Sequence, residues 1–145
     1  MRAYPPIGGI RTVEEFKAHL AALDLSMPCD VELQTGPEST LAQPIKLNDK
    51  SIGNRFCIHP MEGWDGTADG KPSEATIRRW RNFGLSGAKL IWGGEAVAVR
   101  HDGRANPNQL LMSVANKRGL AELRDAVLNA HREVADTTDD LLIGL

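Results

Sequence analysis

Two short apolar runs decide the fold of this chain: NRFCIHPM at residues 54–61 and AKLIWGGEA at residues 88–96. Continuous apolar runs of this length, bounded by proline or glycine, are typical of strands that are buried on both faces. A third run opens at residues 141–145. We therefore predict three buried strands, separated by segments long enough to hold helices.

The segments between these runs have helical periodicity. Ser73 can cap a helix whose apolar face includes Ile77, Trp80 and Phe83, and Gly84 and Gly87 are expected to end it. A second helix is predicted over about 116–135. Its apolar stripe consists of Leu120, Leu123, Val127, Ala130, His131 and Val134. Strands that alternate with helices indicate an α/β fold with a parallel sheet.

The lengths of the connections favour one kind of α/β fold. The loops that follow the strands are long and polar, whereas the links from helix to strand, 84–87 and 136–140, are short. Barrels of (β/α) units carry their chemistry on long strand-to-helix loops. A doubly wound sheet is the alternative, but the first strand-to-helix turn lacks the G-x-G-x-x-G pattern of dinucleotide sites.

The first 43 residues differ in character and are interpreted as an extension. The sequence TVEE at residues 12–15 is a capping box, which predicts an amphipathic helix over about 12–25. Residues 26–43 have the proline and glycine content of a surface connection. From residue 44 onward, residues 45–47 and 51–52 flank an Asn-Asp-Lys turn, which predicts a short β-hairpin. The predicted domains are thus 1–43 and 44–145.

Composition narrows the function classes. With 41% hydrophobic and 25% charged residues the chain has the balance of a soluble globular protein, and a net charge of -2 without a basic block argues against nucleic-acid binding. No apolar run approaches the ~20 residues of a membrane span, so a cytoplasmic protein is expected. Cys29 and Cys57 are expected to be reduced thiols, and the scattered histidines do not predict a metal site.

The ends of the first two strands resemble a known family. IGNRF at 52–56, HPM at 59–61 and DG at 65–66 are similar to the first barrel strand of the Old Yellow Enzyme family of NAD(P)H:flavin oxidoreductases. GAKLI at 87–91, EAVAV at 95–99 and Gly103-Arg104 resemble its second strand and following loop. The resemblance covers about 44–145 and implies the N-terminal part, about three strands, of a (β/α)8 TIM barrel, with the hairpin plugging its bottom.

The resemblance also implies a cofactor and a site. The family binds FMN, which takes a hydride from NAD(P)H and passes it to an electron-poor alkene or similar small-molecule substrate. The residues that correspond to cofactor-contacting positions are His59, Pro60, Met61, Glu62 and Ala96. Trp64 corresponds to a side chain of the substrate pocket, and Glu62 departs from the usual threonine or cysteine. The strands that would hold the FMN phosphate are not seen, so the chain alone is expected to be an inactive fragment.

Structural roles are the alternatives to the site roles that the resemblance implies. His59, taken alone, fits a strand-end histidine bonded to a backbone carbonyl. Glu95 is equally compatible with an active-site role and with a structural carboxylate that binds loop amides. The arginines of the first predicted barrel helix are interpreted as a solvated face: Arg78, Arg79 and Arg81. The alternative function is a non-catalytic truncated barrel domain that serves as a structural or interaction piece. Homo-oligomers are compatible with both the enzyme and this alternative. An aldolase or decarboxylase barrel is the weaker third hypothesis.

Overall fold

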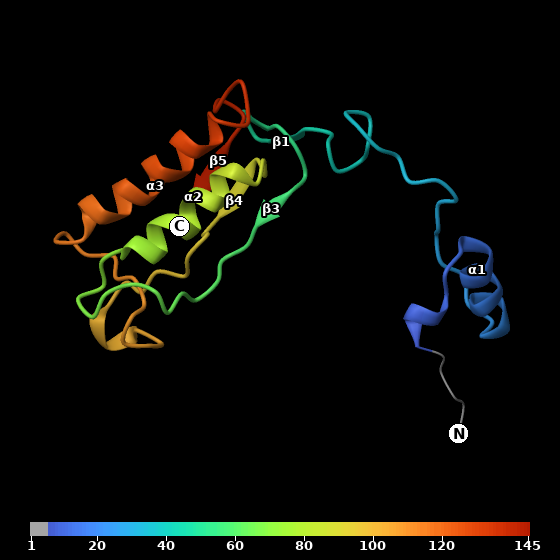
Figure 1. The fold of residues 1–145 in the computed structure, drawn as a ribbon, viewed down its shortest axis with the longest axis horizontal. Helices are drawn as coiled ribbons and strands as arrows, with labels where there is room; N and C mark the ends of the chain where they lie inside the picture. The colour runs from blue at the N-terminus through green and yellow to red at the C-terminus, as the bar shows by residue number, and fades with distance from the viewer. Residues whose placement is uncertain (1–5) are drawn as a thin grey trace. The chain divides into compact units, whose positions relative to one another are not determined.

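The computed structural model describes residues 6–145, which divide between Thr35 and Gly36 into two compact units (Figure 1). The first unit contains a 3-10 turn, η1 (Ile7–Gly9), and helix α1 (Val13–Ala22). Thr12 caps α1 and accepts the Glu15 N–H at 3.2 Å, which confirms the helix start. The Glu15 carboxylate accepts the N–H of Arg11 at 2.7 Å instead of that of Thr12, so the reciprocal half of the capping box is displaced by one residue.

The second unit begins with residues 36–43, ahead of the predicted boundary at 43/44. The Arg55 N–H donates to the Leu41 carbonyl at 2.9 Å, which ties this segment to the unit. Strands β1 (Ile45–Leu47) and β2 (Lys50–Ile52) then form the predicted antiparallel hairpin. Its turn has Asn48 at φ 52°, a conformation that asparagine tolerates better than most residues.

A three-stranded parallel sheet forms the centre of the second unit. Its order is β3 (Cys57–Ile58), β4 (Leu90–Trp92) and β5 (Leu142–Gly144), with Ile58, Ile91 and Ile143 in one row across the sheet. Helices α2 (Glu74–Leu85) and α3 (Lys117–His131) lie side by side and pack on this sheet (Figure 1). A second 3-10 turn, η2 (His101–Gly103), lies in the β4–α3 connection. The fold is therefore mixed α/β, and the sheet is not closed into a barrel.

The core lies on one side of this sheet. Trp80, Leu123 and Val127 of the helices pack with Ile91, and Ile58 and Ile143 flank that cluster. The alternate strand residues point to the other face because successive side chains of a strand alternate. They remain accessible: Cys57, Leu90 and Leu142 are half-buried, and Trp92 is 53% exposed. The prediction of buried strands covered by helices thus holds for one face of the sheet, because within the second unit α2 and α3 pack on that face only.

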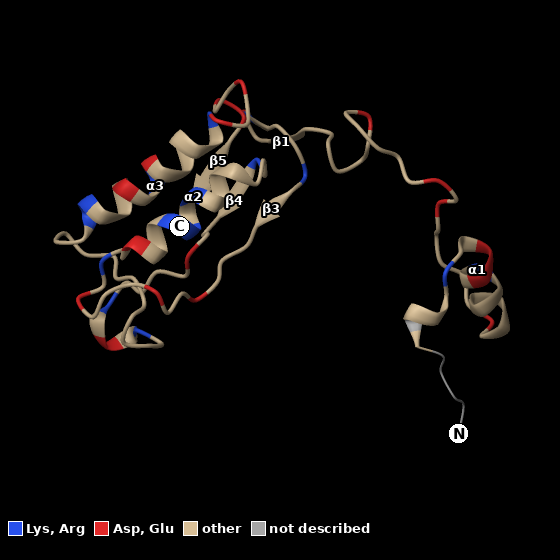
Figure 2. Ribbon diagram, in the orientation of Figure 1, with Lys and Arg blue, Asp and Glu red and all other residues tan. Residues whose placement is uncertain are grey.

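The first predicted strand is also shorter than expected. Only Cys57 and Ile58 pair with β4, and Phe56, His59, Pro60 and Met61 are exposed. Because β3 has no partner on its outer side among the described residues, pairing with β4 alone defines its length. Charged residues of both signs are interspersed over the helices and loops of this unit (Figure 2). No helix within residues 6–145 combines the length and apolar character needed to cross a membrane.

Gly84 lies inside α2, so the prediction that it ends this helix is wrong. A Cβ atom at Gly84 would lie 2.4 Å from the Val127 carbonyl oxygen and 2.9 Å from the Ala130 Cβ. The missing side chain therefore allows α3 to approach α2 closely. The helix stops at Leu85, and Gly87 with φ 75° reverses the chain toward β4.

We expect Gly84→Val to lower the free energy of unfolding by about 2 kcal/mol or more, since a side chain at this crossing overpacks the interface. Urea denaturation followed by tryptophan fluorescence measures the change. Gly103→Val is the matched control, because the nearest atom to its Cβ is 3.8 Å away. Equal stability of the two variants would contradict the role of Gly84 at the crossing.

Candidate functional site

The residues expected to contact a flavin follow the carboxyl ends of β3 and β4. The Ala96 N–H donates to the Met61 carbonyl oxygen at 3.0 Å, so the two strand ends meet at one edge of the parallel sheet. Met61 and Ala96, two of the expected flavin contacts, thus lie together at the carboxyl ends of β3 and β4. Pro60 packs beside Gly93, where an added Cβ would lie 3.0 Å from the Pro60 Cγ. That this edge binds a flavin stays a prediction.

A hollow of about 200 Å³ opens at this edge. Its lining residues come from the β3 end, the β4 end and α2: Ile58, His59, Met61, Glu62, Gly63, Arg79, Phe83 and Gly94. Pockets that enclose drug-sized ligands span roughly 300–1,000 Å³, so this hollow has room for part of a flat ring. Ala96 and Trp64 are outside its lining, and the Trp64 side chain is 66% exposed.

A larger hollow of about 480 Å³ lies at the opposite end of the sheet, between the hairpin and the residues before β5. It is lined by Asp49, Lys50, Asp139 and Asp140, among others. Open parallel sheets bind ligands outside the carboxyl ends of their strands, and this hollow lies at the amino ends. The smaller hollow is therefore the better candidate. Within the described part of the chain, no three His, Cys, Asp or Glu side chains converge as a metal site.

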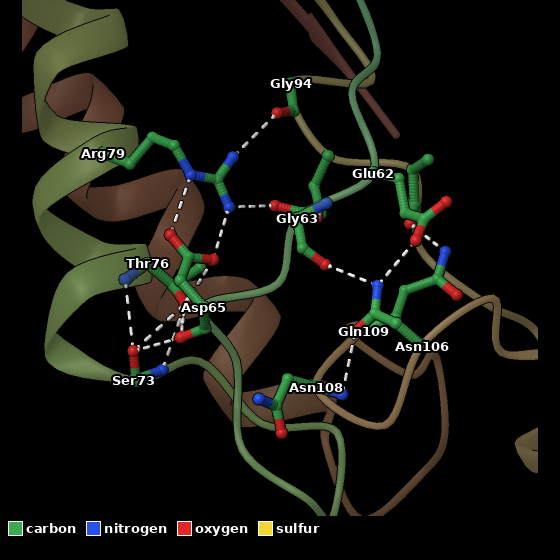
Figure 3. A network of polar contacts seen from close by, with 12 residues as sticks. Glu62, Gly63, Asp65, Ser73, Thr76, Arg79, Gly94, Asn106, Asn108 and Gln109 are labelled. Carbon is green, nitrogen blue, oxygen red and sulfur yellow. Dashed lines mark hydrogen bonds and ion pairs between the residues drawn. The ribbon is translucent and has the colours of Figure 1, made fainter.

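Arg79 connects the two strand-end segments from α2 (Figure 3). Its Nε and Nη2 donate to the two carboxylate oxygens of Asp65 at 2.9 and 2.7 Å. The same Nη2 donates to Glu95, and Nη1 reaches the Gly94 carbonyl at 3.4 Å. The predicted solvated face is thus wrong for Arg79, whose side chain is 27% exposed. Its neighbour Arg81 does lie at the surface, where it pairs with Glu133 at 2.7 Å.

Glu95 has the structural role that was one of its two interpretations. It is 1% exposed, and its Oε1 accepts the Gly63 N–H at 2.6 Å. A Cβ at Gly63 would lie 2.3 Å from this oxygen, so the contact requires a glycine. Glu95 therefore holds the backbone between Glu62 and Trp64, two of the predicted site residues. A contact with a ligand is not needed to explain its burial.

The β4–α3 connection contributes polar side chains that sequence reasoning missed (Figure 3). The buried Asn106 donates its Nδ2 to Glu62 Oε1 at 2.7 Å and to the Gly63 carbonyl at 3.0 Å. The buried Gln109 donates its Nε2 to the Ala96 carbonyl at 2.7 Å. Both residues lie in an aperiodic polar loop, where no local pattern distinguishes a buried amide from a solvated one. Together they hold the Glu62 carboxylate and the backbone of Gly63 and Ala96 from the β4–α3 connection.

Arg104 ties the same loops together through backbone oxygens only. It donates to the carbonyls of Gln109, Ala68 and Thr67, with the shortest contact at 2.6 Å to Gln109. The Gly103-Arg104 pair carried part of the family resemblance. In this structure the Arg104 guanidinium holds the backbone of two loops through several N–H donors. This structural role accounts for an arginine at this position, and no ligand is needed to explain it.

The amino end of α2 fixes Asp65. Ser73 and Thr76 form a capping box, and the Thr76 Oγ1 also donates to the Asp65 carbonyl at 2.8 Å, as does the Ser73 hydroxyl. A carboxylate is favoured near a helix N-terminus by the helix dipole. Hydrogen bonds from Arg79 lower the pKa of Asp65 below its usual 3.8, outweighing the effect of burial.

The lowered pKa of Asp65 predicts a pH-dependent contribution to stability. Since the folded state holds the proton less tightly than the unfolded state, ionised Asp65 stabilises the fold above its unfolded value of 3.8. This contribution is lost as the pH falls below that value through the lowered folded pKa. We expect the stability difference between wild type and Asp65→Asn to be present at pH 6 and to shrink progressively below about pH 4.

Urea denaturation at a series of pH values measures this difference. Asp102→Asn is the control, because the Asp102–Arg100 pair lies in solvent, with side chains 69% and 76% exposed, and such pairs contribute little. A wild-type advantage over Asp65→Asn that stays constant from pH 6 to about pH 2.5 would contradict the prediction.

Comparison with known proteins adds no assignment: no family model matches the chain, and no curated protein matches it. The sequence motifs and the geometry of the strand ends therefore carry the functional argument.

Proposed function

We propose that this chain forms the first part of an FMN-dependent (β/α)8-barrel oxidoreductase of the Old Yellow Enzyme type. The hydrogen bond between Ala96 and Met61 carries the proposal. It joins the two strand ends whose sequences resemble the flavin-contacting segments of that family. This hydrogen bond lies at the carboxyl ends of the parallel strands, where barrels of this kind place their chemistry.

The open sheet supports the barrel part of the proposal. Neither β3 nor β5 has a second partner strand among the described residues, and no helix of the second unit covers the face with Leu90, Trp92 and Leu142. In a closed barrel, further strands pair with both edges, and side chains of that face fill the interior. The apolar character of both faces is what a barrel strand requires.

The residues at the carboxyl edge suit a flat aromatic cofactor. The hollow has apolar walls from Ile58, Met61 and Phe83, and Gly94 adds no side chain. The backbone of His59–Met61 and the methyl group of Ala96 would lie along the ring, with Trp64 beside the substrate. Bound FMN supplies the hydride-transfer chemistry, and NAD(P)H is its reductant. The chain's own groups bind and orient it, and Glu62 adds a carboxylate held by Asn106.

The uncovered face also suits the second candidate, a non-catalytic interaction domain. Trp92 is 53% exposed, and β3 and β5 each have one edge without a partner strand among the described residues. Such features promote association with another chain. This candidate predicts association, including homo-oligomers, without any response to flavins. Association is expected of both candidates, whereas only the first predicts a response to FMN, which a titration measures.

An NMR titration tests the flavin proposal. We would add FMN at about 1 mM to the ¹⁵N-labelled chain, a concentration at which weak binding is detectable. We expect the largest shift changes at the amides of Met61, Glu62, Gly63 and Ala96. Riboflavin, which lacks the phosphate, should give the same pattern, and AMP, which lacks the isoalloxazine ring, should give none. Shift changes elsewhere, or equal changes with AMP, would refute the assignment.

A further inference from the structure

We infer that Arg79 is a positioning residue, which holds the segment after β3 and the segment after β4 as one surface. The inference deepens the proposed function and rests on it for the identity of the ligand, an isoalloxazine ring. Its structural part concerns this chain's own residues and can be tested without a ligand.

The position of Arg79 is set by the helix and not by the loops that it holds. The next residue, Trp80, is 1% exposed in the core, and α2 packs along α3 over its length. The Arg79 guanidinium also lies over the Phe83 ring, with its carbon 5.8 Å from the ring centroid. The guanidinium is thus presented to the strand ends from a rigid element, which is the arrangement that fixes a site most accurately.

From this fixed point the contacts spread in two directions. Toward the β3 end, Arg79 binds both carboxylate oxygens of Asp65. Toward the β4 end, it binds Glu95, whose other oxygen accepts the Gly63 N–H. Gly63 lies between the predicted site residues Glu62 and Trp64, and Ala96 directly follows Glu95. A shift of Arg79 therefore moves backbone on both sides of the hollow.

These contacts need a guanidinium. A planar fork can bind one carboxylate through two nitrogens while one of those nitrogens also faces a second carboxylate. A lysine ammonium keeps the positive charge but cannot reproduce the paired bonds to Asp65 together with the bond to Glu95. Arg79→Lys therefore separates geometry from charge. Arg81→Lys is a matched control in the same helix, since Arg81 also pairs with a carboxylate, Glu133, but at the surface.

The test compares amide hydrogen exchange by NMR in the wild-type chain, Arg79→Lys and Arg81→Lys. We expect Arg79→Lys to speed exchange at the amides of Gly63 and Ala96 by about tenfold or more, with the α3 amides unchanged. Arg81→Lys should leave Gly63 and Ala96 as in wild type. Glu95→Gln is a second variant of nearly the same shape, and it should speed exchange at Gly63 in the same way.

The same samples are then titrated with FMN, a readout that a purely structural role would not move. We expect Arg79→Lys to require about fivefold more FMN than wild type for half of the shift change at Glu62, and Arg81→Lys to match wild type. Unchanged exchange at Gly63 and Ala96 in Arg79→Lys would overturn the inference. An equal loss of protection at Gly63, Ala96 and throughout α2, α3 and β4 in Arg79→Lys would also overturn it, because exchange at the strand ends would then report only the stability of the whole unit. If Arg79→Lys speeds exchange at Gly63 and Ala96 but the wild-type chain shows no response to FMN, the flavin proposal is refuted and the positioning role of Arg79 stands.

Discussion

Replacement of Arg79 by methionine is expected to lower the free energy of unfolding by about 3–5 kcal/mol, the usual cost of leaving a buried charge without its partner. The reason is Glu95, which is 1% exposed and has Arg79 as its ion-pair partner. Without the guanidinium, the buried Glu95 carboxylate loses the ion-pair partner that offsets its burial. Asp65 loses its pair of hydrogen bonds in the same change.

Urea denaturation followed by tryptophan fluorescence measures this loss. Arg81→Met is the control and should cost less than about 1 kcal/mol, since its ion pair with Glu133 is half exposed. Addition of Glu95→Leu to Arg79→Met should recover part of the stability, because removing both partners of a buried pair costs less than removing one. Similar losses for Arg79→Met and Arg81→Met would show that the Arg79 network adds nothing to stability.

The second large effect concerns the cofactor. We expect residues 1–145 alone to bind FMN no more tightly than about 100 µM and to turn over no NAD(P)H, because tight binding needs preorganised groups from several sides of a ligand. The described residues offer two strand ends and a hollow of about 200 Å³. In the part of the chain that the structure describes, Arg79 is the one arginine or lysine that lines this hollow, and it already pairs with Asp65 and Glu95, so this lining leaves no free cation for the FMN phosphate.

Quenching of FMN fluorescence measures the affinity, and light scattering measures the size of the species that binds. The uncovered apolar face and unpaired strand edges are expected to promote association at the concentrations used. Stoichiometric binding by a folded monomer in the range of about 1 µM would contradict the prediction. It would mean that the two strand ends form a self-sufficient flavin site, and the barrel proposal would lose its main reason.

Much of the local structure of this chain could be predicted because its signals act over a few residues. The Ser73 cap, the Thr12 cap and the hairpin turn at Asn48 each rest on hydrogen bonds or backbone preferences within a single turn. The parallel pairing of β3 with β4 and of β4 with β5 was also predictable, because strands that alternate with helices along the chain indicate a parallel sheet. That alternation brings Met61 and Ala96 to the same edge.

Two errors show where local signals are ambiguous. A glycine near the end of a helical pattern is typical of a helix stop, but Gly84 is inside α2, and its lack of a side chain serves the crossing with α3. Continuous apolar strands are typical of burial on both faces, but the helices of the second unit cover one face only. In both cases the deciding neighbour is distant in the sequence.

The sequence by itself determined the order of helices and strands, the capped helix starts and the strand ends at which Met61 and Ala96 meet. Tertiary structure alone decided which charged groups are buried there. Arg78, Arg79 and Arg81 look alike in the sequence, and Arg79 differs because Asp65 and Glu95, 14 and 16 residues away, converge on it. Ion pairing at such separations depends on how two loops fold against a helix, and no local periodicity or propensity encodes that approach.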